Sequence, residues 1–157
     1  MNNQTKKRIQ CVSWVLFVLY ILFLTYLLFL SEGFGHRLSE HRGLRYNLIP
    51  FQEIRRFWIY RDLVGGWAAF LNIGGNIIGF CPFGFILPVL SRRYRKVFKT
   101  VRMGFFLSLF VECMQLVLHV GSFDVDDIML NTLGTFLGFL CFVVTNWVRR
   151  WFYEKKV

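Results

Sequence analysis

The sequence has few acidic residues, few prolines and no closely paired cysteines. Nine Asp and Glu stand against 19 Lys and Arg, so the formal net charge is +10. Cys11, Cys81, Cys113 and Cys141 fall in or beside apolar segments, which disfavours a disulfide framework or a zinc site. A glycine-rich phosphate loop, a nucleophile elbow and His/Cys metal spacing are also missing. The sequence therefore carries no established catalytic signature.

Charged residues are absent from three long segments and number one, Glu112, in a fourth, although they make up 18% of the sequence. Hydrophobic residues reach 55% and aromatic residues 19%, which is more apolar surface than a soluble domain of this length can bury. About 20 apolar residues cross the hydrocarbon core as a helix. The sequence therefore predicts a single all-α membrane domain over residues 1–157, an integral bundle of four transmembrane helices. The predicted spans cover about residues 11–30, 66–90, 103–120 and 128–148.

The first two predicted spans carry distinct local signals. Lys6, Lys7 and Arg8 precede the first span, which ends without a small-residue cleavage site, so we expect an uncleaved signal anchor. The second span contains several glycines and Pro82, which removes a backbone donor from its middle. We therefore expect a broken or kinked helix that faces the bundle interior.

The hydrophilic connection at residues 31–65 contains a predicted amphipathic helix at about residues 50–60. Pro50 suits the first turn of such a helix. Beyond it, four apolar residues share one helical face: Phe51, Ile54, Phe57 and Trp58. We expect this helix to lie in the membrane interface, where Trp and Arg are both favoured. The alternative is a loop helix packed on the bundle.

Most Lys and Arg residues flank the N-terminal side of the first span, join the second and third spans, or follow the fourth. The turn at residues 121–127 has none. The positive-inside rule therefore predicts that both termini are cytoplasmic, with the acidic turn and the amphipathic helix outside. Because the cations adjoin apolar spans, we expect anionic lipid head groups as partners and no nucleic acid.

The third predicted span carries polar residues on one face: Ser108, Glu112, Gln115 and His119. An ionisable residue within a span is costly and is a candidate functional residue, although it can also form a hydrogen bond between helices. The turn that follows holds Asp124, Asp126 and Asp127. Asp124 fits a helix N-cap and Asp127 the third helical position. Three neighbouring carboxylates repel one another, so capping explains all three less well than a ligand or ion role.

Asparagines of the second and fourth spans complete the predicted site. Eight residues could line a polar cavity that opens outward: Asn72, Asn76, Glu112, Gln115, Asp124, Asp126, Asp127 and Asn131. The G-x-x-x-G pairs Gly75/Gly79 and Gly134/Gly138 allow close helix approach. We expect these glycines to pack helices, and assembly into a homo-oligomer through them stays open.

Four motifs follow one another between residues 45 and 140. They are Asn47-Leu-Ile-Pro-Phe51, Asn76 through Cys81-Pro-Phe-Gly84 to Pro88, Glu112-x-x-Gln115, and Phe123-Asp-Val-Asp-Asp127 followed by Asn131-Thr-Leu-Gly134 and Gly138. In this order and spacing they resemble the VanZ-like family, which is named for a teicoplanin-resistance protein. The resemblance implies a multi-pass protein of the bacterial cell membrane and, for some members, glycopeptide resistance. Many relatives carry Arg at the position of Gly121, so here we expect another cation near the aspartates, supplied by the first outer loop.

Two main hypotheses about function follow. The first is a membrane factor, with no catalytic residue or cofactor assigned, that acts at the outer face on a glycopeptide antibiotic or a cell-wall precursor. The alternative is a metal-dependent membrane enzyme for a lipid-linked cell-envelope substrate. In it, Asp124, Asp126 and Asp127 would hold a divalent cation and Glu112 would be the general acid or base. A structural subunit or small transporter is a third possibility.

Overall fold

The structure is a computed structural model that describes residues 3–30, 46–60 and 66–154. Much of the predicted first outer loop, residues 31–45 and 61–65, therefore lies outside the described residues. The elements are, in chain order, α1 (Asn3–Phe29), β1 (Tyr46–Asn47), α2 (Gln52–Ile59), α4 (Gly66–Leu90), the 3-10 turn η1 (Arg92–Tyr94), α5 (Val97–Val117), β2 (Phe123–Asp124) and α6 (Val125–Glu154). The predicted all-α bundle is confirmed, with one two-residue strand pair added.

Four of these helices contain a segment long and apolar enough to cross a membrane. The segments are Gln10–Phe29, Ile73–Leu90, Val97–Val117 and Val125–Phe152. They confirm the four predicted spans and a membrane location. The third helix begins six residues before the predicted boundary at 103, within the charged connection. Lys and Arg can extend toward the interface from a helix end, so their charges do not mark where the helix begins.

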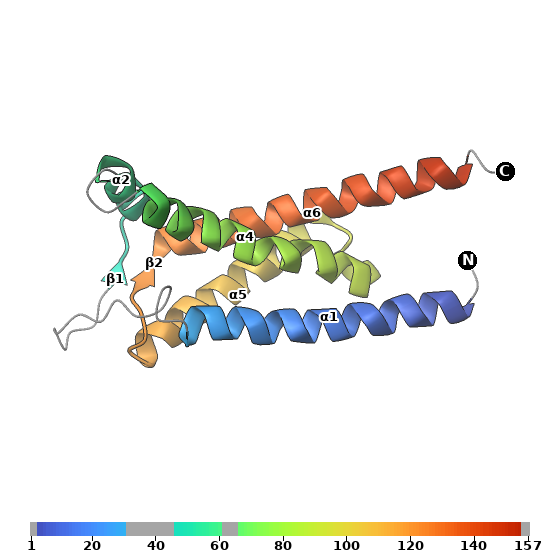
Figure 1. Cartoon of the computed structure of the whole chain (residues 1–157), viewed down its shortest axis with the longest axis horizontal. Helices are drawn as coiled ribbons and strands as arrows, with labels where there is room; N and C mark the ends of the chain where they lie inside the picture. The colour runs from blue at the N-terminus through green and yellow to red at the C-terminus, as the bar shows by residue number, and fades with distance from the viewer. Residues whose placement is uncertain (1–2, 31–45, 61–65, 155–157) are drawn as a thin grey trace.

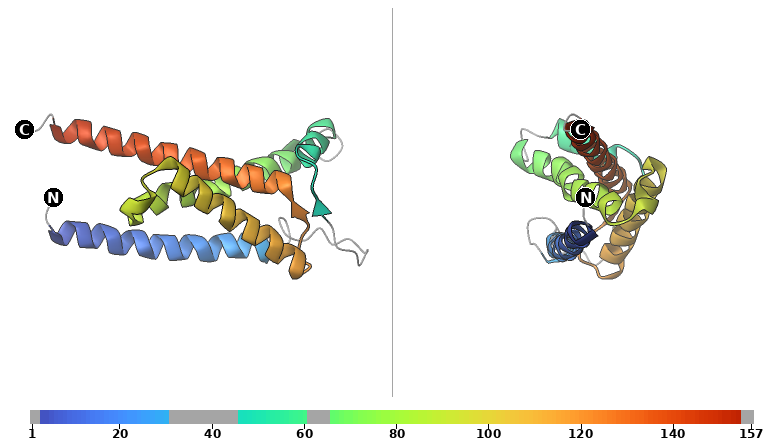
Figure 2. Two further views of the ribbon diagram at one scale, coloured as in Figure 1. Left: turned by 180° about the vertical axis from the view of Figure 1, so that it is seen from behind. Right: turned by 90° about the vertical axis from the view of Figure 1, so that its right-hand side faces the viewer.

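α6 packs against both α4 and α5, and α1 contacts α4. The two chain termini lie at one end of the bundle, and the connection between α4 and α5 points toward that end (Figures 1 and 2). β1, β2 and α2 lie at the opposite end (Figure 1). The acidic turn and the amphipathic helix therefore share one end of the molecule, as the alternation of spans predicts.

Of the broken or kinked helix predicted for the second span, the break is absent. α4 is one helix from Gly66 to Leu90, and both Pro82 and Pro88 lie inside it. A proline removes one hydrogen bond from the helix, whereas unwinding would leave several backbone groups without partners in the hydrocarbon core. The expected inward orientation is confirmed for the second half of α4, where Phe80, Phe83 and Leu87 are buried.

The contact between α4 and α6 depends on glycine. A Cβ atom on Gly134 would lie 2.2 Å from the Ile77 carbonyl oxygen, and one on Gly138 would lie 1.9 Å from the Cys81 carbonyl oxygen. Both glycines therefore allow backbone to touch backbone, and the packing role of this G-x-x-x-G pair is confirmed. Gly79 differs, because its Cβ would only contact Leu24 of α1 at 3.7 Å.

Candidate functional site

A short parallel strand pair brings the acidic turn to the segment before α2. Tyr46 pairs with Phe123 and Asn47 with Asp124. Neither strand exceeds two residues, so no alternation of apolar and polar residues was available in the sequence to indicate it. The pairing places two segments that are distant in the sequence side by side and begins the polar site at this end of the bundle.

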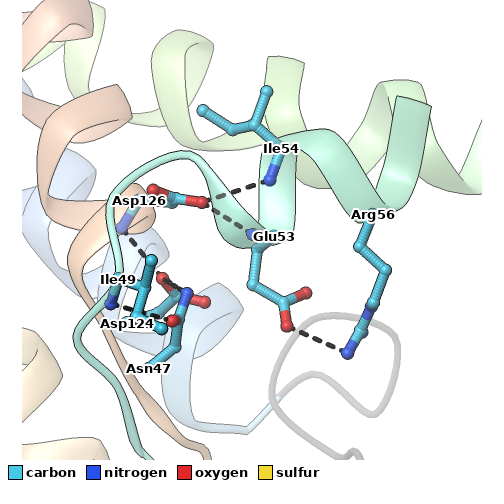
Figure 3. Close-up of polar contacts among 7 residues, drawn as sticks. All are labelled: Asn47, Ile49, Glu53, Ile54, Arg56, Asp124 and Asp126. Atoms are coloured by element: carbon cyan, nitrogen blue, oxygen red, sulfur yellow. Dashed lines mark hydrogen bonds and ion pairs between the residues drawn. The ribbon is translucent and has the colours of Figure 1, made fainter. Parts of the chain in front are cut away.

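Asp126 holds the N-terminus of α2 from another helix. Its carboxylate accepts backbone hydrogen bonds from Glu53 at 2.8 Å and from Ile54 at 3.1 Å (Figure 3). It also accepts one from the Phe51 N–H. The first N–H groups of a helix have no partner within the helix, and a carboxylate there also meets the positive end of the helix dipole. Asp126 is only 1% exposed. It therefore serves as the N-cap that α2 does not supply for itself.

The local backbone explains why α2 needs this distant cap. Phe51, at the N-cap position, has a φ of 65° and makes no side-chain capping bond. The helix begins only at Gln52, so the prediction that Pro50 forms its first turn is wrong. Phe57 is buried, whereas Trp58 is exposed. Because α2 also contacts α4 and α6, the packing expected of a loop helix is present, and its place in the membrane interface stays a prediction.

Asp124 joins three segments. Its Oδ1 atom accepts the Asp126 N–H at 2.8 Å, which confirms its role as the N-cap of α6, and it also accepts the Asn47 Nδ2 donor at 3.1 Å. Asn47 Oδ1 accepts the Ile49 N–H at 3.1 Å. Burial raises the pKa of the Asp124 carboxyl, the bonds from Asp126 N–H and Asn47 lower it, and the charges of Asp126 and Glu53 raise it again. The net direction is upward.

Glu112 and Asp127 tie the turn to the other two helices of the core. Glu112, 2% exposed on α5, accepts the Asp124 N–H through Oε2 at 2.9 Å. Asp127 on α6 accepts a hydrogen bond from the Asn76 side chain of α4. We call Glu112, Asp124, Asp126 and Asp127 the acidic cluster. Each member has a hydrogen-bond donor from a different part of the chain, so the cluster links β1, α2, α4, α5 and α6.

The remaining predicted residues occupy separate positions. Gln115 donates to the Leu28 carbonyl oxygen of α1 at 3.0 Å, and Asn131 donates to Ser108 Oγ at 2.9 Å, deep between α5 and α6. His119 is exposed, with a φ of 56°, just after α5 ends. It therefore does not continue the buried polar face. The side chain of Asn72 lies outside what the structure describes.

The two most buried aspartates, Asp124 and Asp126, accept hydrogen bonds from backbone N–H groups and from the Asn47 side chain. The sequence predicts another cation near the aspartates, supplied by the first outer loop, in place of the Arg that relatives carry at Gly121. Residues 31–45 and 61–65 of that loop lie outside the described residues, so this stays a prediction. Gly121 itself lies against Gln115, whose Cβ would be 3.3 Å from a Cβ added there. Within residues 3–30, 46–60 and 66–154, no group of three His, Cys, Asp or Glu residues could hold a metal ion.

Comparison with known proteins places the chain in a family. The model of the VanZ/LLP1 family matches residues 17–147. The chain belongs to the VanZ/LLP1 family. Protein VanZ of Enterococcus faecium is 29% identical over 102 residues, which are 64% of this chain and 53% of that protein. The chain thus spans about half the length of this relative. No solved structure matches it.

The VanZ/LLP1 match covers the whole acidic cluster and α2. It also covers Asn47 and Ser108, which were not among the predicted ligand-binding residues. Asn47 donates a hydrogen bond to Asp124, and Ser108 accepts one from Asn131. Asn47 could have been found from its place three residues before Pro50, since Asn commonly begins a turn by bonding to the backbone two residues on. Ser108 was visible as part of the polar face of the third span.

Proposed function

We propose that this VanZ/LLP1 protein lowers the susceptibility of a bacterium to glycopeptide antibiotics of the teicoplanin type. In this proposal the acidic cluster and α2 act together at the outer face of the cell membrane, on the antibiotic or on the cell-wall precursor it binds. Family membership supports the general role. The distribution of Lys and Arg supports an outer location for this end of the bundle.

The observation that carries the proposal is the capping of α2 by Asp126. The buried Asp126 carboxylate of α6 holds the start of α2 and gives this helix a fixed position, although α2 has only eight residues. Isolated helices of that length are marginal in water. A fixed amphipathic helix at the membrane surface is a suitable platform for a large amphiphilic ligand.

Burial separates the two roles within the site. Glu112, Asp124 and Asp126 are 2%, 5% and 1% exposed, so a bulky ligand does not reach their oxygens while α2 is in place. The exposed residues of α2 include Arg55 and Trp58. We therefore assign ligand contact to the exposed face of α2 and assign the positioning of α2 to the three buried members of the acidic cluster, Glu112, Asp124 and Asp126.

A complementation experiment tests this proposal. A strain that lacks the protein should become more susceptible to a teicoplanin-type glycopeptide and unchanged toward antibiotics with intracellular targets. The wild-type chain should restore the original level, and Glu112→Gln at equal abundance in the membrane should not. Cys113→Ala, a change at the neighbouring exposed residue of α5, is the control and should restore it fully. Full restoration by Glu112→Gln would show that the cluster is dispensable.

A further inference from the structure

The connection between α4 and α5 is strongly basic, and it lies far from the acidic cluster. Six cations fall within residues 92–102, and the segment contains no Asp or Glu: Arg92, Arg93, Arg95, Lys96, Lys99 and Arg102. All are exposed except Lys99, which is partly buried. We call residues 91–102 the basic connection. Its charge is not balanced within its own sequence.

Folding does not neutralise these charges either. Among residues 3–30, 46–60 and 66–154, no carboxylate forms an ion pair with any of the six cations, and the ion pair Arg56–Glu53 lies on α2. Arg95 instead donates through Nε to the Pro88 carbonyl oxygen at 3.3 Å, near the end of α4. Arg102 lies over the Phe98 ring, 5.9 Å from its centre. Both contacts position a guanidinium group and leave its charge uncompensated.

The charges in the second half of the basic connection destabilise the start of α5. Lys96 is at the N-cap position of α5 and Lys99 is in its first turn, which contains no acidic residue. Cations at a helix N-terminus oppose the helix dipole. Several like charges close together also repel one another. An anion from outside the chain would reverse both effects, so these charges are better explained by a partner than by internal stability.

The position of the basic connection identifies that partner. The second span ends at Leu90 and the third begins at Val97, so four of the cations lie between the spans. Lys99 and Arg102 lie in the first two turns of α5, from which long side chains can extend to the surface of the bilayer. Phe98 is 74% exposed next to Arg102, which sets an apolar side chain beside the charges. We propose that the basic connection binds an anionic glycerophospholipid, with the phosphate among the cations and an acyl chain against Phe98. This site is independent of the proposed function at the other end.

Native mass spectrometry of the full chain in detergent tests the assignment. The probes are phosphatidylglycerol and phosphatidylcholine. The test variant is Arg92→Gln/Arg93→Gln/Lys96→Gln, and the control is Lys7→Gln/Arg8→Gln/Arg150→Gln, which removes the same charge from exposed residues of α1 and α6. Each surface cation contributes about fivefold to the binding of anionic lipid, so the test variant should lose roughly a hundredfold in affinity for phosphatidylglycerol. The control should lose much less affinity than the test variant, because its three cations lie on two separate helices and not within the basic connection.

Three results would overturn the proposal. They are equal losses in the test and control variants, unchanged binding by the test variant, or equal affinity of the wild type for the two lipids. Inorganic phosphate, added at constant ionic strength, should leave the lipid bound, and its displacement would indicate a site for free phosphate instead. Lys96→Gln alone should lose about fivefold, which keeps the test decisive if the triple variant does not fold.

Discussion

Replacing Asp126 by alanine should release the first turn of α2 from the bundle. The substitution removes the acceptor of three backbone N–H groups, those of Phe51, Glu53 and Ile54. One net hydrogen bond to a charged group contributes about 1.5–3 kcal/mol, and a lost N-cap costs about 0.5–2 kcal/mol. The freed N–H groups can regain water once α2 opens, so we expect a total loss of about 3 kcal/mol. This corresponds to a change of roughly a hundredfold in the opening equilibrium.

Amide hydrogen exchange of the protein in lipid nanodiscs measures this opening directly. Peptides that cover α2 should exchange roughly a hundred times faster in Asp126→Ala, because local exchange reports the free energy of local opening. Asp126→Asn keeps one acceptor oxygen but not the charge, so the exchange rate of α2 in this variant should fall between those of the wild type and Asp126→Ala. Peptides from the second half of α6 should exchange as in the wild type.

Asp127→Asn is the matched control, since it removes the same charge one residue away. Asp127 accepts a hydrogen bond from the Asn76 side chain of α4, so the exchange of α2 should stay close to that of the wild type in this variant. If Asp126→Ala leaves the exchange of α2 unchanged, the capping argument is refuted. An equal acceleration in Asp127→Asn would show that general charge removal, not the cap, controls α2.

Three further predictions concern packing and pH. Gly138→Ala should lower the stability of the bundle by about 3 kcal/mol, because its Cβ would meet the Cys81 carbonyl at 1.9 Å, whereas Gly79→Ala should be tolerated; thermal unfolding in detergent compares the two. Asn47→Ala should cost about 1 kcal/mol through the lost bond to Asp124, and an unchanged unfolding midpoint would contradict this. Burial raises the pKa of Asp124 in the folded protein above its ordinary value of 3.8, so the folded state binds this proton more tightly than the unfolded state. The resulting contribution to the free energy of unfolding is fully present below pH 3.8 and is lost as the pH rises through the pKa of the folded protein. Asp124→Asn should remove this component from the pH dependence of the unfolding midpoint, and an identical pH profile would argue against it.

The spans and the shared polar face of α5 were predictable from the sequence, since both follow from the 3.6-residue period and from the cost of charge in lipid. Ser108, Glu112 and Gln115 share a buried face of α5 as expected. The N-cap role of Asp124 was also predictable, because it depends only on residues close in the sequence. His119 could not be excluded from that face, because the end of α5 depends on a backbone conformation at His119 that few non-glycine residues adopt.

The partners of the acidic residues could not be predicted in the same way. Asp126 caps a helix more than 70 positions away in the chain, and no local pattern records such a contact. The strand pair that aligns Asn47 with Asp124 is too short to leave a periodic signal. The choice between a broken and a continuous α4 at Pro82 could not be made from the sequence for another reason. Proline is a strong breaker in water, where an unwound backbone can bond to solvent, but the hydrocarbon core provides no such alternative.

The most direct test is the teicoplanin susceptibility of cells that carry Asp126→Ala. The variant must be present in the membrane at the wild-type level, in a strain without the natural protein. If Asp126 positions α2 for resistance, these cells should be as susceptible as cells without any copy, while Cys113→Ala cells remain resistant. Cells with Asp126→Ala that keep full resistance would contradict the proposal that the acidic cluster and α2 form the functional site.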